Sequence, residues 1–276
     1  MGCNVSRLPV TVTVTDSASE VQPGPCSKPG KLPTLGDGRS LQVSTLLGEG
    51  GFGYVQLVTD GEQHYALKVM NKGQLLQLKQ QRLVLREVQI QKLASHPFLV
   101  RLLCSYQDSH HLYLLLDAAM GGELFTYVSK QPKFQLPFDQ TRFYVANVAA
   151  ALEFLHSKGI IYRDLKLENL LLDGDGYVKV CDFGLSKMVG KDGRTHTECG
   201  TAVYNAPEMV QSGMSAEGYS MAVDFWALGV LTYEMLVGYA PPACSPVHTR
   251  RVLANRCAAA AMRTGQDSPC STCPGW

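Results

Sequence analysis

Strand-like alternation of hydrophobic and polar positions recurs along the first 120 residues. In Tyr54–Thr59, for example, Val55, Leu57 and Thr59 alternate with their neighbours, which is the period of a half-buried strand. The spacing becomes helical over Lys79–Ala94. These patterns predict a small lobe of five strands and one helix, with strands at Leu41–Leu47, Tyr54–Thr59, His64–Met70, Leu99–Gln107 and His111–Asp117.

Helical spacing dominates the rest of the chain. Val145, Val148, Leu152 and Leu155 recur at i, i+3, i+7 and i+10, so one helix face is apolar and should be buried. The pattern therefore predicts an α+β fold of two lobes, a mostly β N-lobe and a mostly helical C-lobe. The other elements expected in the C-lobe are two short strands and a second apolar helix, at Leu170–Leu172, Val178–Cys181 and Met221–Val237.

Composition separates the two ends of the chain from the lobes. Residues 1–38 are rich in Ser, Thr, Pro and Gly, which indicates a flexible leader. Residues 246–276 carry four Arg, one Asp and no convincing periodicity, which indicates a low-complexity tail. The N-lobe is then expected over 39–119 and a partial C-lobe over 120–245.

Charge and hydropathy exclude several classes of protein. Lys and Arg number 25 and Asp and Glu 24, so the net charge is +1 and no nucleic-acid partner is expected. No apolar run approaches the roughly 18–20 residues of a membrane-spanning helix. The N-terminus lacks a secretory signal, so the nine cysteines indicate a reducing compartment and a cytoplasmic location.

Glycines gather in the segment Gly48-Glu49-Gly50-Gly51-Phe52-Gly53, a G-x-G-x-x-G pattern. Glycine lets the backbone approach a polyphosphate closely, and the N–H groups of such a turn can donate to phosphate oxygens. The same pattern also opens dinucleotide-binding folds, where it runs into a helix. Here a predicted strand follows, which favours a hairpin over a nucleotide. A simple glycine-rich turn remains the alternative.

Lys68 lies inside an apolar strand, where lysine is rare unless it is paired. Glu87 on the next predicted helix shares a face with Leu83 and Ile90 and should point inward. We therefore expect an ion pair between Lys68 and Glu87. The alternative is an edge-strand lysine that faces water.

The densest polar cluster is Tyr162-Arg163-Asp164-Leu165-Lys166-Leu167-Glu168-Asn169, followed by Asp182-Phe183-Gly184. Carboxylate and amide oxygens of this kind, together with substrate phosphates, are suitable ligands for Mg²⁺. A charged surface loop is the alternative, but it is disfavoured when all three motifs occur in this order.

These motifs follow one another along the chain and are followed by Ala206-Pro207-Glu208. In this order, residues 41–242 resemble the protein kinase family. The resemblance implies ATP-dependent transfer of the γ-phosphoryl group to Ser or Thr of proteins, with ATP and Mg²⁺ as cofactors. It is closest to the cyclic-nucleotide-dependent (AGC) branch in the segments Tyr162-Arg163-Asp164, His96-Pro97-Phe98-Leu99-Val100, Cys199-Gly200-Thr201 and Gly121-Gly122-Glu123-Leu124-Phe125.

The resemblance also implies roles for single residues. Asp164 would orient the substrate hydroxyl, and Lys166 would neutralise charge on the transferring group. Asn169 and Asp182 would bind magnesium. The residues implied to bind ATP are Lys68 with its partner Glu87, and Gly48, Gly50, Gly51, Phe52, Gly53, Val55, Ala66, Asp117, Ala119 and Leu171. Core packing is the alternative for the apolar ones.

Substrate preference follows from the same resemblance. Glu123, Glu168 and Glu234 match positions where relatives place carboxylates against substrate arginines. We therefore expect protein substrates with basic residues upstream of the target Ser or Thr. The alternative for each Glu is a solvated surface charge. No regulatory domain is recognisable, so cyclic-nucleotide control would require a separate regulatory subunit.

Thr197 is the implied regulatory phosphosite, and Arg163 and Lys187 are the expected partners of its phosphate. The alternative is that Thr197 is an unmodified loop hydroxyl, one among Thr195, Thr197 and Thr201.

The segment Met1-Gly2-Cys3-Asn4-Val5-Ser6 fits the N-myristoylation pattern at Gly2. One acyl chain anchors a protein only marginally, so palmitoylation of Cys3 is the expected second signal. This motif predicts membrane association through an N-terminal lipid.

The resemblance ends near Pro241, whereas kinase C-lobes normally continue. No later Arg is placed to pair with Glu208, so we expect a buried and uncompensated carboxylate there. We also expect exposed apolar surface on the Met221–Val237 helix, and Ala202-Val203 replaces the usual Pro-Glu. A truncated, inactive chain that binds nucleotide or a partner without turnover is therefore the second functional hypothesis.

Overall fold

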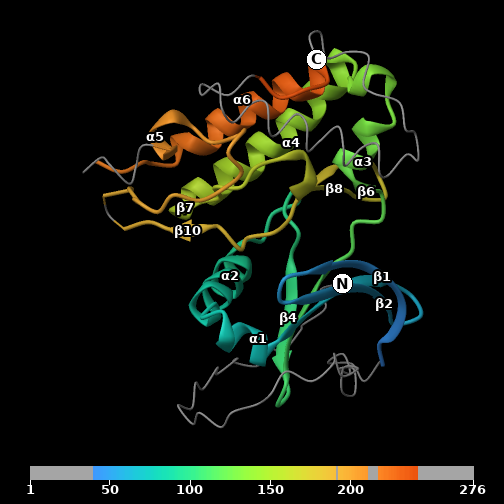
Figure 1. Ribbon diagram of the computed structural model, residues 1–276. Coiled ribbons are helices and arrows are strands. Elements are labelled where there is room, and N and C mark those ends of the chain that lie inside the picture. The colour runs from blue at the N-terminus through green and yellow to red at the C-terminus, as the bar shows by residue number, and fades with distance from the viewer. Residues whose placement is uncertain (1–39, 191, 211–216, 242–276) are drawn as a thin grey trace, which may run out of the picture. The chain divides into compact units, whose positions relative to one another are not determined.

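The computed structural model describes residues 40–190, 192–210 and 217–241 (Figure 1). The chain divides between Ala119 and Met120 into two compact units. The first is mostly strands and the second mostly helices, which confirms the expected α+β, two-lobed fold. Acylation of Gly2 and Cys3, like the other predictions for residues 1–38 and 246–276, lies outside the described residues.

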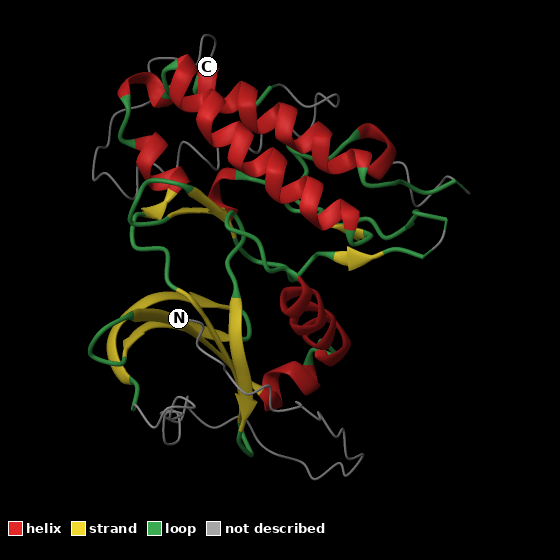
Figure 2. Cartoon of the chain, turned by 180° about the vertical axis from the view of Figure 1, so that it is seen from behind, coloured by secondary structure: helices red, strands yellow, loops and turns green. Residues whose placement is uncertain are grey.

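The N-terminal unit is built on a curved five-stranded antiparallel sheet (Figure 2). The strand order is β1-β2-β3-β5-β4, and all five expected strands are present with small shifts at their ends. Their bounds are β1 (Gln42–Gly50), β2 (Gly53–Thr59), β3 (His64–Asn71), β4 (Leu102–Gln107) and β5 (His111–Asp117).

Two helices lie between β3 and β4. The longer, α2 (Gln81–Leu93), is the expected helix. The short α1 (Lys72–Gln77) was not expected. It begins after Asn71, whose side-chain oxygen accepts a hydrogen bond from the backbone N–H of Gln74 at 3.1 Å. Asn is a favoured residue at this capping position because its side chain satisfies a free backbone donor.

Alternation along β3 gives the sheet two different faces. Tyr65, Leu67 and Val69 enter a buried hydrophobic cluster with residues of the neighbouring strands. The intervening Ala66 and Lys68 must project to the opposite face, because successive strand side chains alternate. The register that pairs Val55 with Lys68 and Leu57 with Ala66 places β2 side chains on that second face.

The second unit is organised around two helices that run side by side, α4 (Phe138–Ser157) and α6 (Ala222–Val237) (Figure 1). Val148, Leu152 and Leu155 of α4 are fully buried, which confirms the expected apolar face. The smaller elements are β6 (Gly122–Glu123), α3 (Leu124–Ser129), η1 (Pro132–Phe134), β7 (Ile160–Ile161), η2 (Leu167–Asn169), β8 (Leu170–Leu172), β9 (Val178–Val180), β10 (Lys187–Met188) and α5 (Pro207–Val210).

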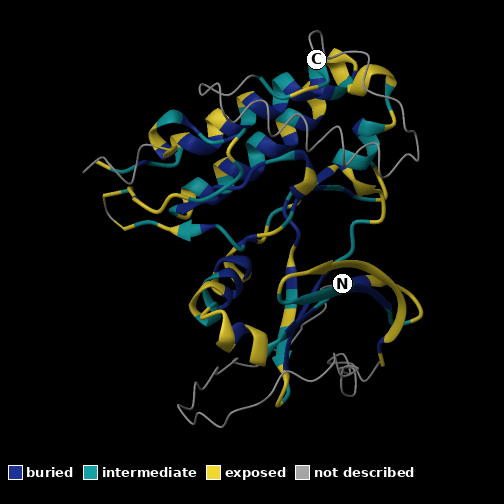
Figure 3. Cartoon of the chain, viewed as in Figure 1, coloured by how far each residue is buried: buried dark blue, intermediate teal, exposed yellow. Residues whose placement is uncertain are grey.

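Helix α6 carries exposed positions, as the sequence predicts (Figure 3). The burial predicted for Glu208 is not observed. Phe225 and Trp226 are 51% and 44% exposed, so this helix does present apolar surface. Glu208 in α5 is exposed rather than buried, so the predicted uncompensated charge is wrong. Its carboxylate keeps its hydration and needs no ion partner. Among the described residues, none of the helices combines the length and hydrophobicity that a membrane crossing requires.

Candidate active site

Lys68 and Glu87 form the expected ion pair within the N-terminal unit. The ammonium Nζ of Lys68 on β3 lies 2.6 Å from Oε1 of Glu87 on α2. The side chain of Glu87 is buried and that of Lys68 is partly exposed. The pair therefore fixes the ammonium while leaving part of it accessible, and an edge-strand lysine that only faces water is ruled out.

The glycine-rich segment is the hairpin between β1 and β2, as the following strand predicted. The two strands pair antiparallel from Gln42 with Thr59 to Gly50 with Gly53. At Gly53 an added Cβ would lie 1.8 Å from the carbonyl oxygen of Val69, so only glycine fits. At Gly48 and Gly51 an added Cβ would meet nothing within 4 Å. Packing within the chain therefore requires Gly53 but not these two.

The remaining residues implied to bind the nucleotide are spread over both units. Val55 and Ala66 lie on the same sheet face as Lys68. Asp117 ends β5, and its Oδ1 lies 3.2 Å from Nη2 of Arg101 in an exposed ion pair. Ala119 is the last residue of the first unit, and Leu171 lies in β8 of the second. Their roles toward a nucleotide stay predictions.

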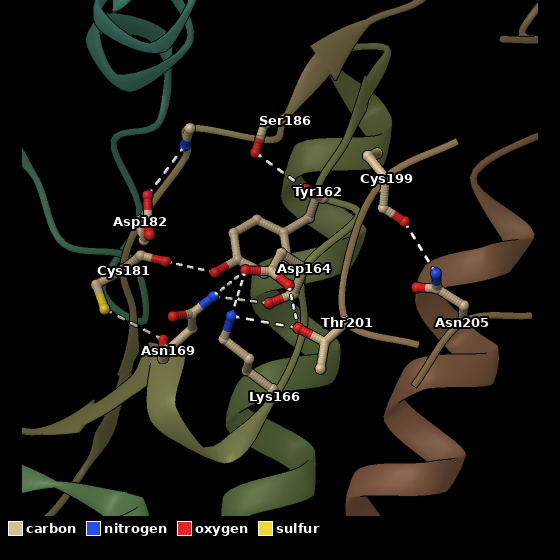
Figure 4. A network of polar contacts seen from close by, with 11 residues as sticks. Tyr162, Asp164, Lys166, Asn169, Cys181, Asp182, Ser186, Cys199, Thr201 and Asn205 are labelled. Atoms are coloured by element: carbon tan, nitrogen blue, oxygen red, sulfur yellow. Dashed lines mark hydrogen bonds and ion pairs between the residues drawn. The ribbon is translucent and has the colours of Figure 1, made fainter. Parts of the chain in front are cut away.

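In the second unit three donors converge on the buried carboxylate of Asp164 (Figure 4). Lys166 Nζ and Asn169 Nδ2 donate to Oδ2 at 2.7 and 2.9 Å. The hydroxyl of Thr201 donates to Oδ1 at 2.8 Å. The carboxylate is therefore held in one orientation by side chains from two distant segments. The interpretation of this segment as a plain charged surface loop is wrong.

The backbone that carries Asp164 is anchored by α6. The buried carboxylate of Asp224 accepts hydrogen bonds from the backbone N–H groups of Tyr162 and Arg163 at 2.9 and 2.8 Å. It also lies 2.8 Å from Nε2 of His156 on α4. Arg163 has a positive φ of 72°, a conformation that costs energy for a residue other than glycine. The Asp224 contacts stabilise that conformation next to the Asp164 carboxylate.

Asn169 and Asp182 have the chemistry of magnesium ligands. Donation from Asn169 Nδ2 to Asp164 leaves the amide Oδ1 as an acceptor. Oδ1 of Asp182 accepts from the N–H of Gly184 at 3.1 Å, and the residue is exposed. One carboxylate and one amide oxygen fit a cation that also binds substrate phosphates. In the described part of the chain no group of three or more His, Cys, Asp or Glu forms a self-sufficient metal site.

The three threonine hydroxyls around the predicted phosphosite differ in their surroundings. Thr195 is buried and accepts a hydrogen bond from Lys187 Nζ at 2.7 Å. Thr201 is engaged with Asp164, and Thr197 is exposed. Of the three hydroxyls, only that of Thr197 is therefore on an exposed residue.

One of the two expected phosphate partners of Thr197, Arg163, contacts a residue that the sequence did not single out, Tyr219. The ammonium of the other, Lys187, donates to Thr195. Arg163 Nη1 donates to the hydroxyl of Tyr219 at 2.9 Å, and that hydroxyl donates to the carbonyl of Thr197 at 2.5 Å. Burial raises the pKa of Tyr219 to about 12, so the hydroxyl stays protonated and able to donate near neutral pH. The hydroxyl of Tyr219 therefore bridges the Arg163 guanidinium and the backbone carbonyl of Thr197.

The three glutamates predicted to face substrate arginines are not equivalent. Glu123 and Glu168 are exposed, and Glu123 also accepts a hydrogen bond from the hydroxyl of Thr126 at 3.3 Å. Glu234 on α6 is only 5% exposed and accepts a hydrogen bond from the hydroxyl of Tyr204. The alternative of a solvated surface charge is therefore wrong for Glu234.

Comparison with known proteins identifies the family. The profile of the protein kinase domain matches residues 41–268. The chain belongs to the protein kinase family. The match covers the ion pair of Lys68 and Glu87, the network around Asp164, and every other site residue described above.

Relatives place the chain near the AGC branch of these kinases, as its motifs indicated. It is 46% identical to the cAMP-dependent protein kinase catalytic subunit of Dictyostelium discoideum over 71% of this chain and 29% of that protein. It is 44% identical to the putative ribosomal protein S6 kinase alpha-1 of Caenorhabditis elegans over 86% of this chain and 30% of that protein. It is 41% identical to the human cAMP-dependent protein kinase catalytic subunit PRKX over 83% of this chain and 63% of that protein. The chain thus spans less than two thirds of the length of each of these three relatives.

Proposed function

We propose that this chain is an ATP-dependent serine/threonine protein kinase. The observation that carries the proposal is the Asp164 carboxylate, which is oriented by Lys166, Asn169 and Thr201 in a member of the protein kinase family. Phosphoryl transfer needs a positioned acceptor hydroxyl and stabilised charge more than covalent chemistry. A carboxylate fixed in this way meets the first need.

Asp164 and the residues that contact its carboxylate then have distinct roles. Asp164 accepts a hydrogen bond from the substrate hydroxyl and orients its oxygen for attack. Lys166, whose ammonium lies 2.7 Å from Asp164, stabilises negative charge on the transferring group. Thr201 holds the other carboxylate oxygen, so that Asp164 does not rotate between turnovers. Since these groups sit on a backbone anchored by Asp224, little reorganisation is needed at the moment of reaction.

When bound, magnesium ATP supplies the phosphoryl group and the cation that neutralises its charge. Asn169 and Asp182 offer oxygen ligands for that cation, and Lys68 offers a charged donor to the phosphates. Glu87 keeps the Lys68 ammonium in place through the 2.6 Å ion pair. The N–H groups of the hairpin between β1 and β2 are suited to the phosphate oxygens.

The proposed substrates are proteins with arginine upstream of the target Ser or Thr. Glu123 and Glu168 are exposed carboxylates that can pair with guanidinium groups. Glu234 keeps this role in the proposal, with one oxygen shared with Tyr204. Kinetics on matched peptides with and without upstream arginine test the preference. Equal kcat/KM for the two peptides would contradict it.

We propose Thr197 as the activating phosphosite. Its exposure supports this assignment, because a kinase must reach the hydroxyl. A phosphate there would compete for Arg163 and draw the guanidinium from the hydroxyl of Tyr219. Activity of Thr197→Ala, compared with that of the phosphorylated parent, tests the switch, and equal activity would refute it.

The remaining proposals concern partners. Relatives named as cAMP-dependent catalytic subunits support a separate regulatory subunit for this chain. Acylation of Gly2 and Cys3 rests on the N-terminal motif alone. A Gly2→Ala chain with unchanged membrane fractionation would refute the acylation.

A kinase-like chain that binds partners without turnover is the second candidate function. The exposed Phe225 and Trp226 of α6 favour it, because large exposed aromatics commonly mark interaction surfaces. A thermal melt with and without magnesium ATP, followed by a phosphotransfer assay, separates the two. A melt shifted by ATP together with turnover that Asp182→Asn abolishes supports the kinase. A shifted melt without turnover supports the second candidate.

A further inference from the structure

The surface formed by α1 and α2 carries positive charge that the proposed phosphoryl transfer does not use. Residues 72–93 contain a single carboxylate, that of Glu87, which is buried and paired with Lys68. Only Lys72 among the basic residues has a hydrogen bond here, from its Nζ to the carbonyl of Asp108 at 2.5 Å. The basic residues of this segment, which we call the α1–α2 basic surface, are Lys72, Lys79, Arg82, Arg86 and Lys92.

The geometry of α2 concentrates part of this charge on one ridge. Arg82 and Arg86 are separated by one helical turn, so they lie on the same side of α2. Leu93 lies two further turns along that side, and the buried Val84 and Glu87 lie on the other. Two like charges at this spacing repel each other and do not stabilise the helix. A polyanionic partner would relieve that repulsion.

Exposed leucines are interleaved in sequence with these charges. Leu76 and Leu78 are 58% and 55% exposed, and they lie close in sequence to the exposed Lys79. Leu83 and Leu93 on α2 are also exposed. Residues 72–93 contain no Phe, Tyr or Trp. The surface thus combines cationic heads with aliphatic side chains and lacks aromatic rings.

We propose that the α1–α2 basic surface docks on an anionic lipid membrane. Lipid headgroups complement the unpaired cations, and the exposed leucines can enter the region between headgroups and acyl chains. Single-stranded nucleic acid would also attract the charge, but such sites stack bases on aromatic side chains, which this segment lacks. The docking needs neither acylation nor catalytic activity, so it stands apart from the proposed kinase function.

Co-sedimentation of the unacylated full chain with vesicles tests the proposal. Binding is expected to vesicles of equal parts phosphatidylcholine and phosphatidylserine and not to phosphatidylcholine alone, and it should fall as salt rises. The double variant Arg82→Gln/Arg86→Gln should bind about 10- to 30-fold more weakly, since each basic residue strengthens attraction to an anionic surface about fivefold. Leu76→Ser/Leu78→Ser should also weaken binding.

The matched control is Lys130→Gln/Lys158→Gln, which removes two exposed charges from the second unit. Its binding should equal that of the parent, and the melting temperatures of all variants should be similar. Absence of binding to the anionic vesicles would overturn the proposal. An equal loss of vesicle binding in the arginine variant and the lysine control would also overturn it. Tighter binding to a single-stranded RNA oligonucleotide than to the vesicles, lost in Arg82→Gln/Arg86→Gln, would also overturn it and indicate a nucleic-acid site.

Discussion

The hydroxyl of Thr201 donates a hydrogen bond to Oδ1 of Asp164 at 2.8 Å, across 37 positions of sequence. The same hydroxyl accepts from Lys166 Nζ at 3.3 Å. This single oxygen therefore joins the segment around Thr201 to the loop that carries Asp164 and Lys166, and it does so at the carboxylate proposed to orient the substrate.

Thr201→Val should lower kcat about 10- to 100-fold, because Asp164 loses the donor that fixes one of its oxygens. Thr201→Ser keeps the hydroxyl and should retain most of the activity. Steady-state kinetics on one peptide substrate provide the measurement. Equal loss in the two variants would show that the methyl group, rather than the hydrogen bond, matters.

The sequence predicted the strands of the sheet better than the long-range contacts of Thr201 and Tyr219. The alternation of hydrophobic and polar residues in β2 and β3 reflects the burial of each strand face. This pattern is local in sequence, so both strands were predicted correctly. The pairing of Lys68 with Glu87 was also predictable, because a charged side chain on an apolar strand or on an inward helix face needs an oppositely charged partner. The short α1 was missed, since six residues are too few for a periodic signal.

The roles of Thr201 and Tyr219 were not predictable from local pattern, because each depends on a contact with a distant segment. Glu208 illustrates the same limit, since its exposure is set by how α5 lies on the second unit. The burial of Glu234 against Tyr204 is a further tertiary effect. A Ser, Thr or Tyr hydroxyl close in sequence to a catalytic motif is only a weak signal.

Gly53→Ala should destabilise the N-terminal unit by about 3 kcal/mol, because its Cβ would lie 1.8 Å from the carbonyl oxygen of Val69. Gly51→Ala is the matched control, since nothing lies within 4 Å of the added Cβ, and its stability should change by less than about 1 kcal/mol. Denaturant unfolding of both variants measures this. Similar stabilities would contradict the geometry of the hairpin.

Tyr219→Phe should destabilise the chain by about 2 kcal/mol, because the buried guanidinium of Arg163 loses an acceptor and Thr197 loses a donor to its carbonyl. Proteolysis near Thr197 should become faster than in the parent. Tyr239→Phe, at an exposed tyrosine whose hydroxyl contacts Tyr233, should cost less than about 1 kcal/mol and leave the proteolysis unchanged. Unchanged stability and proteolysis in Tyr219→Phe would mean that the bridge contributes nothing.

Asp108, in the turn between β4 and β5, should make stability depend on pH. Burial raises its pKa, but hydrogen bonds from the hydroxyl of Tyr113 and from two backbone N–H groups outweigh this and lower the pKa to about 2. Folding therefore favours the ionised form. This stabilisation is complete above the unfolded pKa near 4 and is lost as the pH falls through about 2.

Asp108→Asn should consequently lower the free energy of unfolding by about 1–2 kcal/mol at pH 7, a value reduced for solvent screening because the side chain is 37% exposed. The difference from the parent should shrink below pH 4 and vanish near pH 2. Urea titrations across this range give the measurement. A difference that stays constant with pH would contradict the assigned cause.

The rate of phosphoryl transfer in a single turnover, measured with and without the Asp164 carboxylate, tests the central claim most directly. Asp164→Asn should keep the melting shift produced by magnesium ATP and lose at least about 100-fold in the rate of transfer to a peptide hydroxyl. Transfer at the parental rate by Asp164→Asn, with the nucleotide still bound, would contradict the account.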